Sequence, residues 1–157
     1  MKFDKTVIEI ATSADTDIED ITPEVERFVA SSDIESGWVL ISIAGSTASV
    51  TTIEYESGAV ADLRRACERL APKDATYEHN LRWRDGNGYS HVRAALLGPS
   101  LTLPVAEGRP LCGVWQQIVL CDFDNRPRSR QIHLQIFGFS EPPTTPSNPL
   151  PSLPVDD

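Results

Sequence analysis

The stretch that decides the fold is Arg130-Gln131-Ile132-His133-Leu134-Gln135-Ile136-Phe137-Gly138-Phe139. Its alternating apolar residues are Ile132, Leu134 and Ile136, and the polar residues between them are Gln131, His133 and Gln135. Successive side chains of a strand point to opposite faces of a sheet. The alternation therefore predicts a strand with one face in the core and one polar face, and it places His133 at the surface.

Three earlier segments also have the composition of strands. Residues 6–11 and 47–55 are rich in β-branched side chains, and residues 38–44 are almost entirely apolar, as in a strand covered on both faces. Between residues 77 and 130 several dipeptides are typical of turns, namely Asp85-Gly86, Gly98-Pro99, Glu107-Gly108 and Asp124-Asn125. We interpret this region as a succession of antiparallel strands.

Two segments have the pattern of helices. Thr22-Pro23-Glu24 supplies an N-cap candidate, a proline and an acid for a helix that runs to about Ser31. Apolar residues recur at helical spacing from Val60 to Leu70, and Pro72 ends that helix. Together these segments predict an α+β domain over residues 1–140, with two helices packed on a mostly antiparallel β-sandwich.

The last residues, 141–157, differ from the rest because six of them are proline. Such a composition is typical of an extended polyproline II segment and defines a separate C-terminal tail. Two roles fit this tail: it binds a partner protein, or it is held against the domain or a neighbouring subunit.

Composition restricts the classes of function. The net charge of -9 argues against nucleic acid as a partner, because binding it requires a basic surface. No apolar run approaches the length of a membrane span, and residues 1–5 do not resemble a secretion signal, so we expect a cytoplasmic protein without a membrane partner. The three cysteines are not closely spaced and are interpreted as reduced thiols.

Candidate metal ligands and acids are few. His79 and His91 flank a glycine-rich segment, where two imidazoles on neighbouring strands can converge on one ion such as zinc. Their spacing alone favours the other interpretation, that both are partly exposed polar residues of a hydrophilic loop. Glu54 and Asp62 are candidates for a general base or a further metal ligand. The competing interpretation is an ordinary surface charge or, for Asp62, a helix cap.

Residues suited to a phosphorylated ligand fall in three places. Arg93 comes two residues after His91, which would place it on the same side of an extended strand. Arg93, Arg128 and Arg130 carry the forked donors that bind phosphate. Ser46 and Thr47 follow Gly45, where hydroxyl and backbone donors can hold an oxyanion. Trp115, with Gln116 beside it, can form a flat wall for a ligand or belong to the core.

Several of these residues occur within longer motifs: Tyr77-Glu78-His79, Asn87 with His91, Leu97-Gly98-Pro99-Ser100, Pro104-Val105, Gly108, Gly113 with Trp115-Gln116, and residues 124–130. Over about residues 6–138 the chain resembles the YjbQ-like family, whose members are often described as secondary thiamine-phosphate synthases. The resemblance implies an α+β β-sandwich, a homotrimer, and a histidine-lined pocket that holds a metal such as zinc.

The chain departs from that family at two positions. Where the family has His-Thr-Thr-Ala, this chain has Gly45-Ser46-Thr47-Ala48, and where the family has Asn-Glu it has Ile53-Glu54. A third imidazole is therefore missing from the metal site that the resemblance implies.

Two functions follow as hypotheses. The resemblance implies a transferase that joins a pyrimidine diphosphate to a thiazole phosphate and releases pyrophosphate, with arginines or a metal on the leaving group. The losses at Gly45 and Ile53 favour the alternative, a non-catalytic trimeric protein that binds a small ligand or anion.

Overall fold

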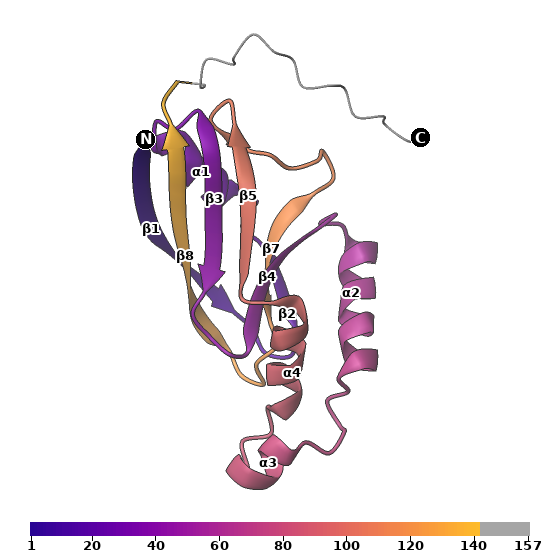
Figure 1. Cartoon of the computed structure of the whole chain (residues 1–157). Coiled ribbons are helices and arrows are strands. Elements are labelled where there is room, and N and C mark those ends of the chain that lie inside the picture. Colours follow the sequence, from indigo (N-terminus) through magenta and orange to yellow (C-terminus); the bar gives the residue numbers. More distant parts are fainter. Residues whose placement is uncertain (142–157) are drawn as a thin grey trace, which may run out of the picture.

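The computed structural model describes residues 1–141, so the proposed roles of the proline-rich tail lie outside the described residues. The chain forms two antiparallel sheets, with strand orders β1-β8-β3-β5-β6 and β2-β7-β4 (Figure 1). The strands are β1 (Lys2–Thr12), β2 (Asp17–Asp20), β3 (Ser36–Ile43), β4 (Ala48–Ile53), β5 (Ser100–Ala106), β6 (Arg109–Pro110), β7 (Gln117–Asp122) and β8 (Arg128–Phe139). The helices are α1 (Thr22–Ser31), α2 (Ser57–Leu70), α3 (Glu78–Trp83) and α4 (Gly88–Leu97). The predicted α+β class is confirmed.

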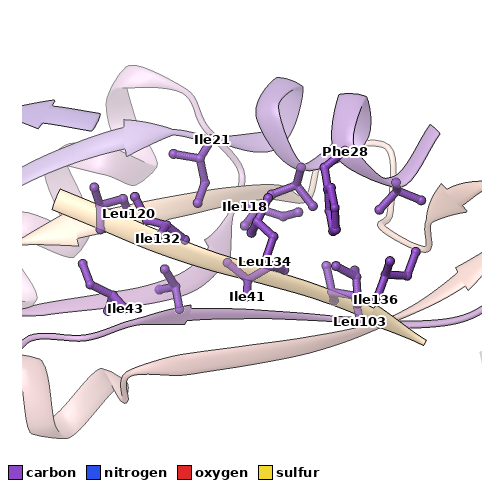
Figure 2. Packing of buried hydrophobic residues seen from close by; sticks show 14 of the residues in the cluster. Ile21, Phe28, Ile41, Ile43, Leu103, Ile118, Leu120, Ile132, Leu134 and Ile136 are labelled. Atoms are coloured by element: carbon purple, nitrogen blue, oxygen red, sulfur yellow. The ribbon is translucent and has the colours of Figure 1, made fainter. Parts of the chain in front are cut away.

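The alternating strand at the end of the domain, β8, lies between β1 and β3 and is antiparallel to both. Ile132, Leu134 and Ile136 are fully buried, as the alternation predicts. They pack with Ile41 of β3 and Leu120 of β7 (Figure 2). The main core therefore fills the space between the two sheets, and α1 closes it.

A second, smaller core lies on the other side of the three-stranded sheet. Val119 and Cys121 of β7 are fully buried there against Val60 of α2 and Ala94 of α4. Strand β7 is thus covered on both faces, and α2 and α4 form an outer layer beside the smaller sheet (Figure 1).

The two predicted helices are confirmed as α1 and α2, but the prediction of strands throughout residues 77–98 was wrong, because α3 and α4 occupy most of this region. Of the predicted turns, Asp85-Gly86 and Gly98-Pro99 follow helices, whereas Glu107-Gly108 joins β5 to β6 and Asp124-Asn125 lies between β7 and β8, as predicted. Arg84 ends α3 with a φ of 58°, and Gly98 ends α4 with a φ of 89°. Within the described part of the chain, no helix has both the length and the apolar character required to cross a membrane.

Candidate functional site

A cavity of about 640 Å³ opens at the end of the domain where α3 and α4 approach the turn between β3 and β4 and the segment before β8 (the lower end in Figure 1). Its walls come from three parts of the chain that are far apart in sequence: residues 45–47, residues 79–91, and residues 125–130, which include the start of β8. The smaller sheet and the two helices fix these segments relative to one another.

A pair of histidines forms one wall. His79 on α3 and His91 on α4 lie with their ring centroids 4.4 Å apart. The Nδ1 atom of His91 is 3.1 Å from the carbonyl oxygen of Ser46, and Nε2 of His79 is 3.1 Å from Asp85 Oδ2. Because each ring uses one nitrogen to contact a protein oxygen, its other nitrogen is left for a ligand or a proton.

Asp85 contacts His79 and positions its ring. Desolvation opposes the charged carboxylate, but the hydrogen bond and charge of His79 outweigh it, so the pKa of Asp85 lies below its ordinary value. When its amide nitrogen faces this carboxylate, Asn87 donates to Asp85 Oδ1 over 3.1 Å. The contact with this carboxylate fixes the orientation of the His79 ring.

The opposite wall is formed by arginines that are held in place by buried carboxylates. Arg130 donates from Nε and Nη2 to the two oxygens of Asp122, each over 2.6 Å, and its Nη2 also donates to Thr47 Oγ1 over 2.8 Å. Asp122 is fully buried, whereas 11% of the Arg130 side chain is exposed. Asp122 therefore orients the guanidinium from behind the cavity wall.

Arg128 repeats this arrangement with Asp124. Its Nε donates to Asp124 Oδ2 over 2.8 Å, and Thr47 Oγ1 donates to the same oxygen over 3.1 Å. Desolvation opposes the charge of Asp124, but the hydrogen bonds of Arg128 and Thr47 outweigh it and hold the pKa of this carboxyl below its usual range. Asp124 is consequently ionised at neutral pH and fixes Arg128.

The cavity wall has the charge of an anion-binding site. Three arginines (Arg126, Arg128 and Arg130) line it against a single carboxylate, Asp85. Within residues 1–141, the Nη1 atoms of Arg128 and Arg130 have no hydrogen-bond acceptor. Such forked donors match the oxygens of a phosphate, and their fixed geometry lowers the cost of ordering them around a ligand.

The described residues do not supply the complete ligand set of the metal site that the family resemblance implies. Among residues 1–141, no group of three or more His, Cys, Asp or Glu side chains is placed to share an ion. His79 and His91 would supply two ligands, whereas a structural or catalytic zinc usually takes three or four from the protein. Gly45 lines the cavity beside them and has no side chain to contribute.

The structure brings five of the predicted site residues to this one cavity: Ser46, Thr47, His79, His91 and Arg128. Arg93 is elsewhere, because α4 is a helix and residues two apart on a helix point about 200° apart around its axis. The interpretation of Arg93 as a neighbour of His91 on an extended strand was therefore wrong.

Arg93 instead holds the end of α2. It is almost fully buried, donates from Nε and Nη2 to the carbonyl oxygen of Ala71 over 3.0 and 2.7 Å, and pairs with Glu68. A further bond of 2.8 Å joins it to Thr16 Oγ1. These contacts account for its burial without any ligand.

The remaining candidates do not line the cavity. Glu54 is exposed just after β4, and exposed Asp62 pairs with Arg65 on α2. Trp115 is 72% exposed, so it is not a core residue. Gln116 Nε2 donates to Thr52 Oγ1 over 2.9 Å and stabilises the loop before β7.

Sequence reasoning missed the carboxylates that organise the site, Asp85, Asp122 and Asp124. The sequence contains a signal for Asp122 and Asp124, which come directly after the apolar residues of β7 and are two residues apart. Arg128 and Arg130, which follow them, have the same spacing. Buried acids need cationic partners, so this pattern predicts a paired cluster.

Comparison with known proteins places the chain in a protein family. A family model described as "UPF0047 protein YjbQ-like" matches residues 6–139. A UPF0047 protein of Methanothermobacter thermautotrophicus is 36% identical over 82% of this chain and 88% of its own length. The UPF0047 protein YugU of Bacillus subtilis is 34% identical over 83% of this chain and 97% of its own length.

Two solved structures have the same fold. A YbjQ-like protein of unknown function from Sulfolobus solfataricus superimposes with a TM-score of 0.79 at 31% identity, over 88% of this chain and all of that one. The hypothetical protein APE1520 from Aeropyrum pernix gives a TM-score of 0.81 at 25% identity, over 87% of this chain and 99% of that one.

Proposed function

The chain belongs to the YjbQ-like UPF0047 family, and we propose that its cavity binds a small phosphorylated ligand between the arginines and the histidine pair. One observation carries this proposal: Arg128 and Arg130, each oriented by a fully buried carboxylate, line the same cavity as His79 and His91. The carboxylates that pair with Arg128 and Arg130 are buried behind the wall, so a small anion that enters the cavity meets the arginine donors first, although the whole chain has a net charge of -9.

The histidines add the capacity to transfer a proton. Imidazole is the side chain best suited to this role near neutral pH. In a transferase that releases pyrophosphate, the arginines would stabilise the leaving diphosphate and a histidine would donate or accept a proton beside it. A thiamine-phosphate synthase-like reaction is therefore the enzymatic form of this proposal, and reversible anion binding without chemistry is its alternative.

Calorimetric titration with inorganic phosphate and pyrophosphate tests the binding proposal. Replacing Arg128 with glutamine should weaken binding by about tenfold or more, because a charge-assisted hydrogen bond contributes about 1.5–3 kcal/mol. Arg126 is exposed and should contribute less to the binding free energy, because an exposed charge usually contributes about 1 kcal/mol or less. Arg126→Gln is therefore expected to weaken binding by only a few-fold.

Arg69→Gln is the matched control, because it removes the same charge from an exposed position on α2 outside the cavity. An equal loss of affinity in Arg69→Gln would assign the effect to overall charge. Absence of phosphate and pyrophosphate binding in the unmodified chain would refute the proposal.

Zinc, or another divalent metal, is a second candidate ligand, favoured by the 4.4 Å spacing of the two imidazoles. We expect the unmodified chain to bind zinc weakly and Gly45→His to bind it at least about tenfold more tightly, because a third imidazole would approach the usual zinc ligand set. An added Cβ at Gly45 meets only Arg130 Nη1, at 3.4 Å, so the position accepts a side chain.

Metal analysis of the purified chain beside Gly45→His and His79→Ala measures this directly. Gly45→Ser is the control, since it fills the same position without an imidazole. If the unmodified chain contains one zinc and His79→Ala contains none, the two histidines form a zinc site. Zinc would then take the place of phosphate as the proposed ligand of the cavity.

Assembly as a homotrimer is also part of the proposal. The outer face of the larger sheet carries Phe3, Trp38 and Phe139, each about half exposed, with Phe137 stacked on Trp38. No described helix lies in front of β1, β8 and β3 in Figure 1. An apolar face of this kind is typical of subunit contacts.

Sedimentation equilibrium should therefore give about three times the 17.3 kDa mass of the chain, and Trp38→Lys should shift the population to monomers. Trp115→Lys is the matched control, because Trp115 is even more exposed but lies in the loop before β7. A monomeric unmodified chain would contradict the assembly.

A further inference from the structure

A second cavity of about 310 Å³ adjoins the arginine-lined cavity. The two cavities share Gly45, Ser46 and His91, so His91 stands at their boundary. The remaining wall of the second cavity, which we call the annex, is formed by Ala48, Ala94, Ala95 and Pro99. The wall is apolar, and all four of these side chains are small.

The walls of the annex are held apart by fixed contacts. Ser49 Oγ donates to the carbonyl oxygen of Ala94 over 2.8 Å, which joins α4 to β4 at the base of the annex. The carbonyl oxygen of Pro99 accepts from the backbone N–H of Ile43 over 2.9 Å, which joins the end of α4 to β3. Because these bonds join α4 to both sheets, the side of the annex formed by Ala48, Ala94 and Pro99 is fixed by the fold, and the turn at Gly45 and Ser46 completes the wall.

The two cavities differ sharply in chemistry. The larger one presents guanidinium groups, whereas the four residues that are unique to the annex offer a ligand no side-chain hydrogen-bond donor. A phosphate in the annex would lose its hydration without compensation, and an apolar group in the arginine cavity would leave charged donors unpaired. The pair of cavities therefore matches one ligand with an anionic end and an apolar end.

The volume of the annex suits a small apolar group. Binding cavities for complete small molecules usually span about 300–1,000 Å³, and the annex, at the lower limit of this range, has room for a planar ring. The His91 ring at the boundary offers a face or edge against which a planar group can stack. Gly45 contributes no side chain at the same boundary, which leaves the passage between the cavities open.

We infer that the ligand is an organic phosphate with a single planar apolar ring, whose phosphate lies among Arg126, Arg128 and Arg130 and whose ring lies in the annex beyond His91. This inference rests on the proposed phosphate-binding function and names its substrate class. The ring is selected by apolar contact with Ala94, Ala95 and Pro99, so aromatic phosphate monoesters are preferred to alkyl monoesters of the same charge.

The test is calorimetric titration of the full chain with phenyl phosphate, methyl phosphate and inorganic phosphate. We expect phenyl phosphate to bind at least about tenfold more tightly than methyl phosphate, because the additional apolar area is removed from water. Ala95→Phe fills the annex from an exposed position on α4 and should abolish this preference while inorganic phosphate binds as before.

Ala75→Phe, at an exposed position outside both cavities, is the matched control and should leave all three affinities unchanged. Equal binding of phenyl and methyl phosphate, with inorganic phosphate still bound, would overturn the inference and leave the proposed function intact. A phenyl preference that survives in Ala95→Phe would also overturn it, because the ring would then lie elsewhere. Failure of all three anions to bind would overturn the proposed function and the inference together.

Discussion

Replacing Arg130 with methionine is expected to lower the free energy of unfolding by about 3–5 kcal/mol and to abolish phosphate binding. The reason is the carboxylate behind it. Asp122 is fully buried and receives two hydrogen bonds from Arg130, so the substitution leaves a buried charge with only Thr12 Oγ1 and the backbone N–H of Asp124 as donors. Denaturant titration measures the loss of stability.

Two further variants separate the charge effect from lost packing. Arg126→Met removes an exposed arginine from the same cavity and should change stability by less than about 0.5 kcal/mol. Adding Asp122→Asn to Arg130→Met neutralises the buried acid, so more than half of the lost stability should return while phosphate binding stays absent. If the double variant is as unstable as the single one, the loss comes from packing and not from the unpaired carboxylate.

The link between stability and binding at Arg130 reflects how the site is built. Its guanidinium bridges the two sheets, because Asp122 ends β7 and Arg130 is the third residue of β8, and Thr47 before β4 accepts from the same group. The network that orients the anion-binding donors thus also holds the end of the sandwich together. Substitutions here require a stability measurement before any loss of binding is interpreted.

The sequence predicted the sheets better than the helices near the site. Strand β8 was predicted because its apolar residues alternate without interruption, and α2 because its apolar residues follow a helical period. Helix α4 was missed because two residues of its buried face, Ser90 and Arg93, are polar and interrupt the apolar pattern. Helix α3 has no buried residue at all, so burial left no periodic signal in its sequence.

The types of the residues predicted the candidate site better than the secondary structure that was assigned to them. His79 and His91 were selected as a pair although they were assigned to strands, and they lie together on two helices. Arg93 was selected for the same chemistry as Arg128, yet it is buried against Ala71 and Glu68. Spacing in the sequence could not separate these two arginines, because the difference depends on which elements pack against each.

Gly138→Ala should be strongly destabilising, with a loss of more than about 3 kcal/mol and a large fraction of unfolded chain at 37 °C. Gly138 of β8 lies directly opposite Gly37 of β3. A Cβ added to Gly138 would lie 2.1 Å from the carbonyl oxygen of Ser36, and one added to Gly37 would lie 1.9 Å from that of Phe137. Both obstacles are backbone atoms of paired strands, so no side-chain rotation relieves them.

The two strands would have to separate at this pair, which is the second from the end of the β3–β8 ladder, and β8 also pairs there with Lys2 of β1. Gly113→Ala is the matched control, because its added Cβ meets nothing closer than 3.8 Å, and it should alter stability by less than about 0.5 kcal/mol. Thermal and denaturant unfolding of both variants, with circular dichroism at 20 °C, gives the comparison. If Gly138→Ala unfolds at the same midpoint as the unmodified chain, β3 and β8 are less closely paired than in the structure. The position of Arg130, near the other end of β8, would then also have to be revised.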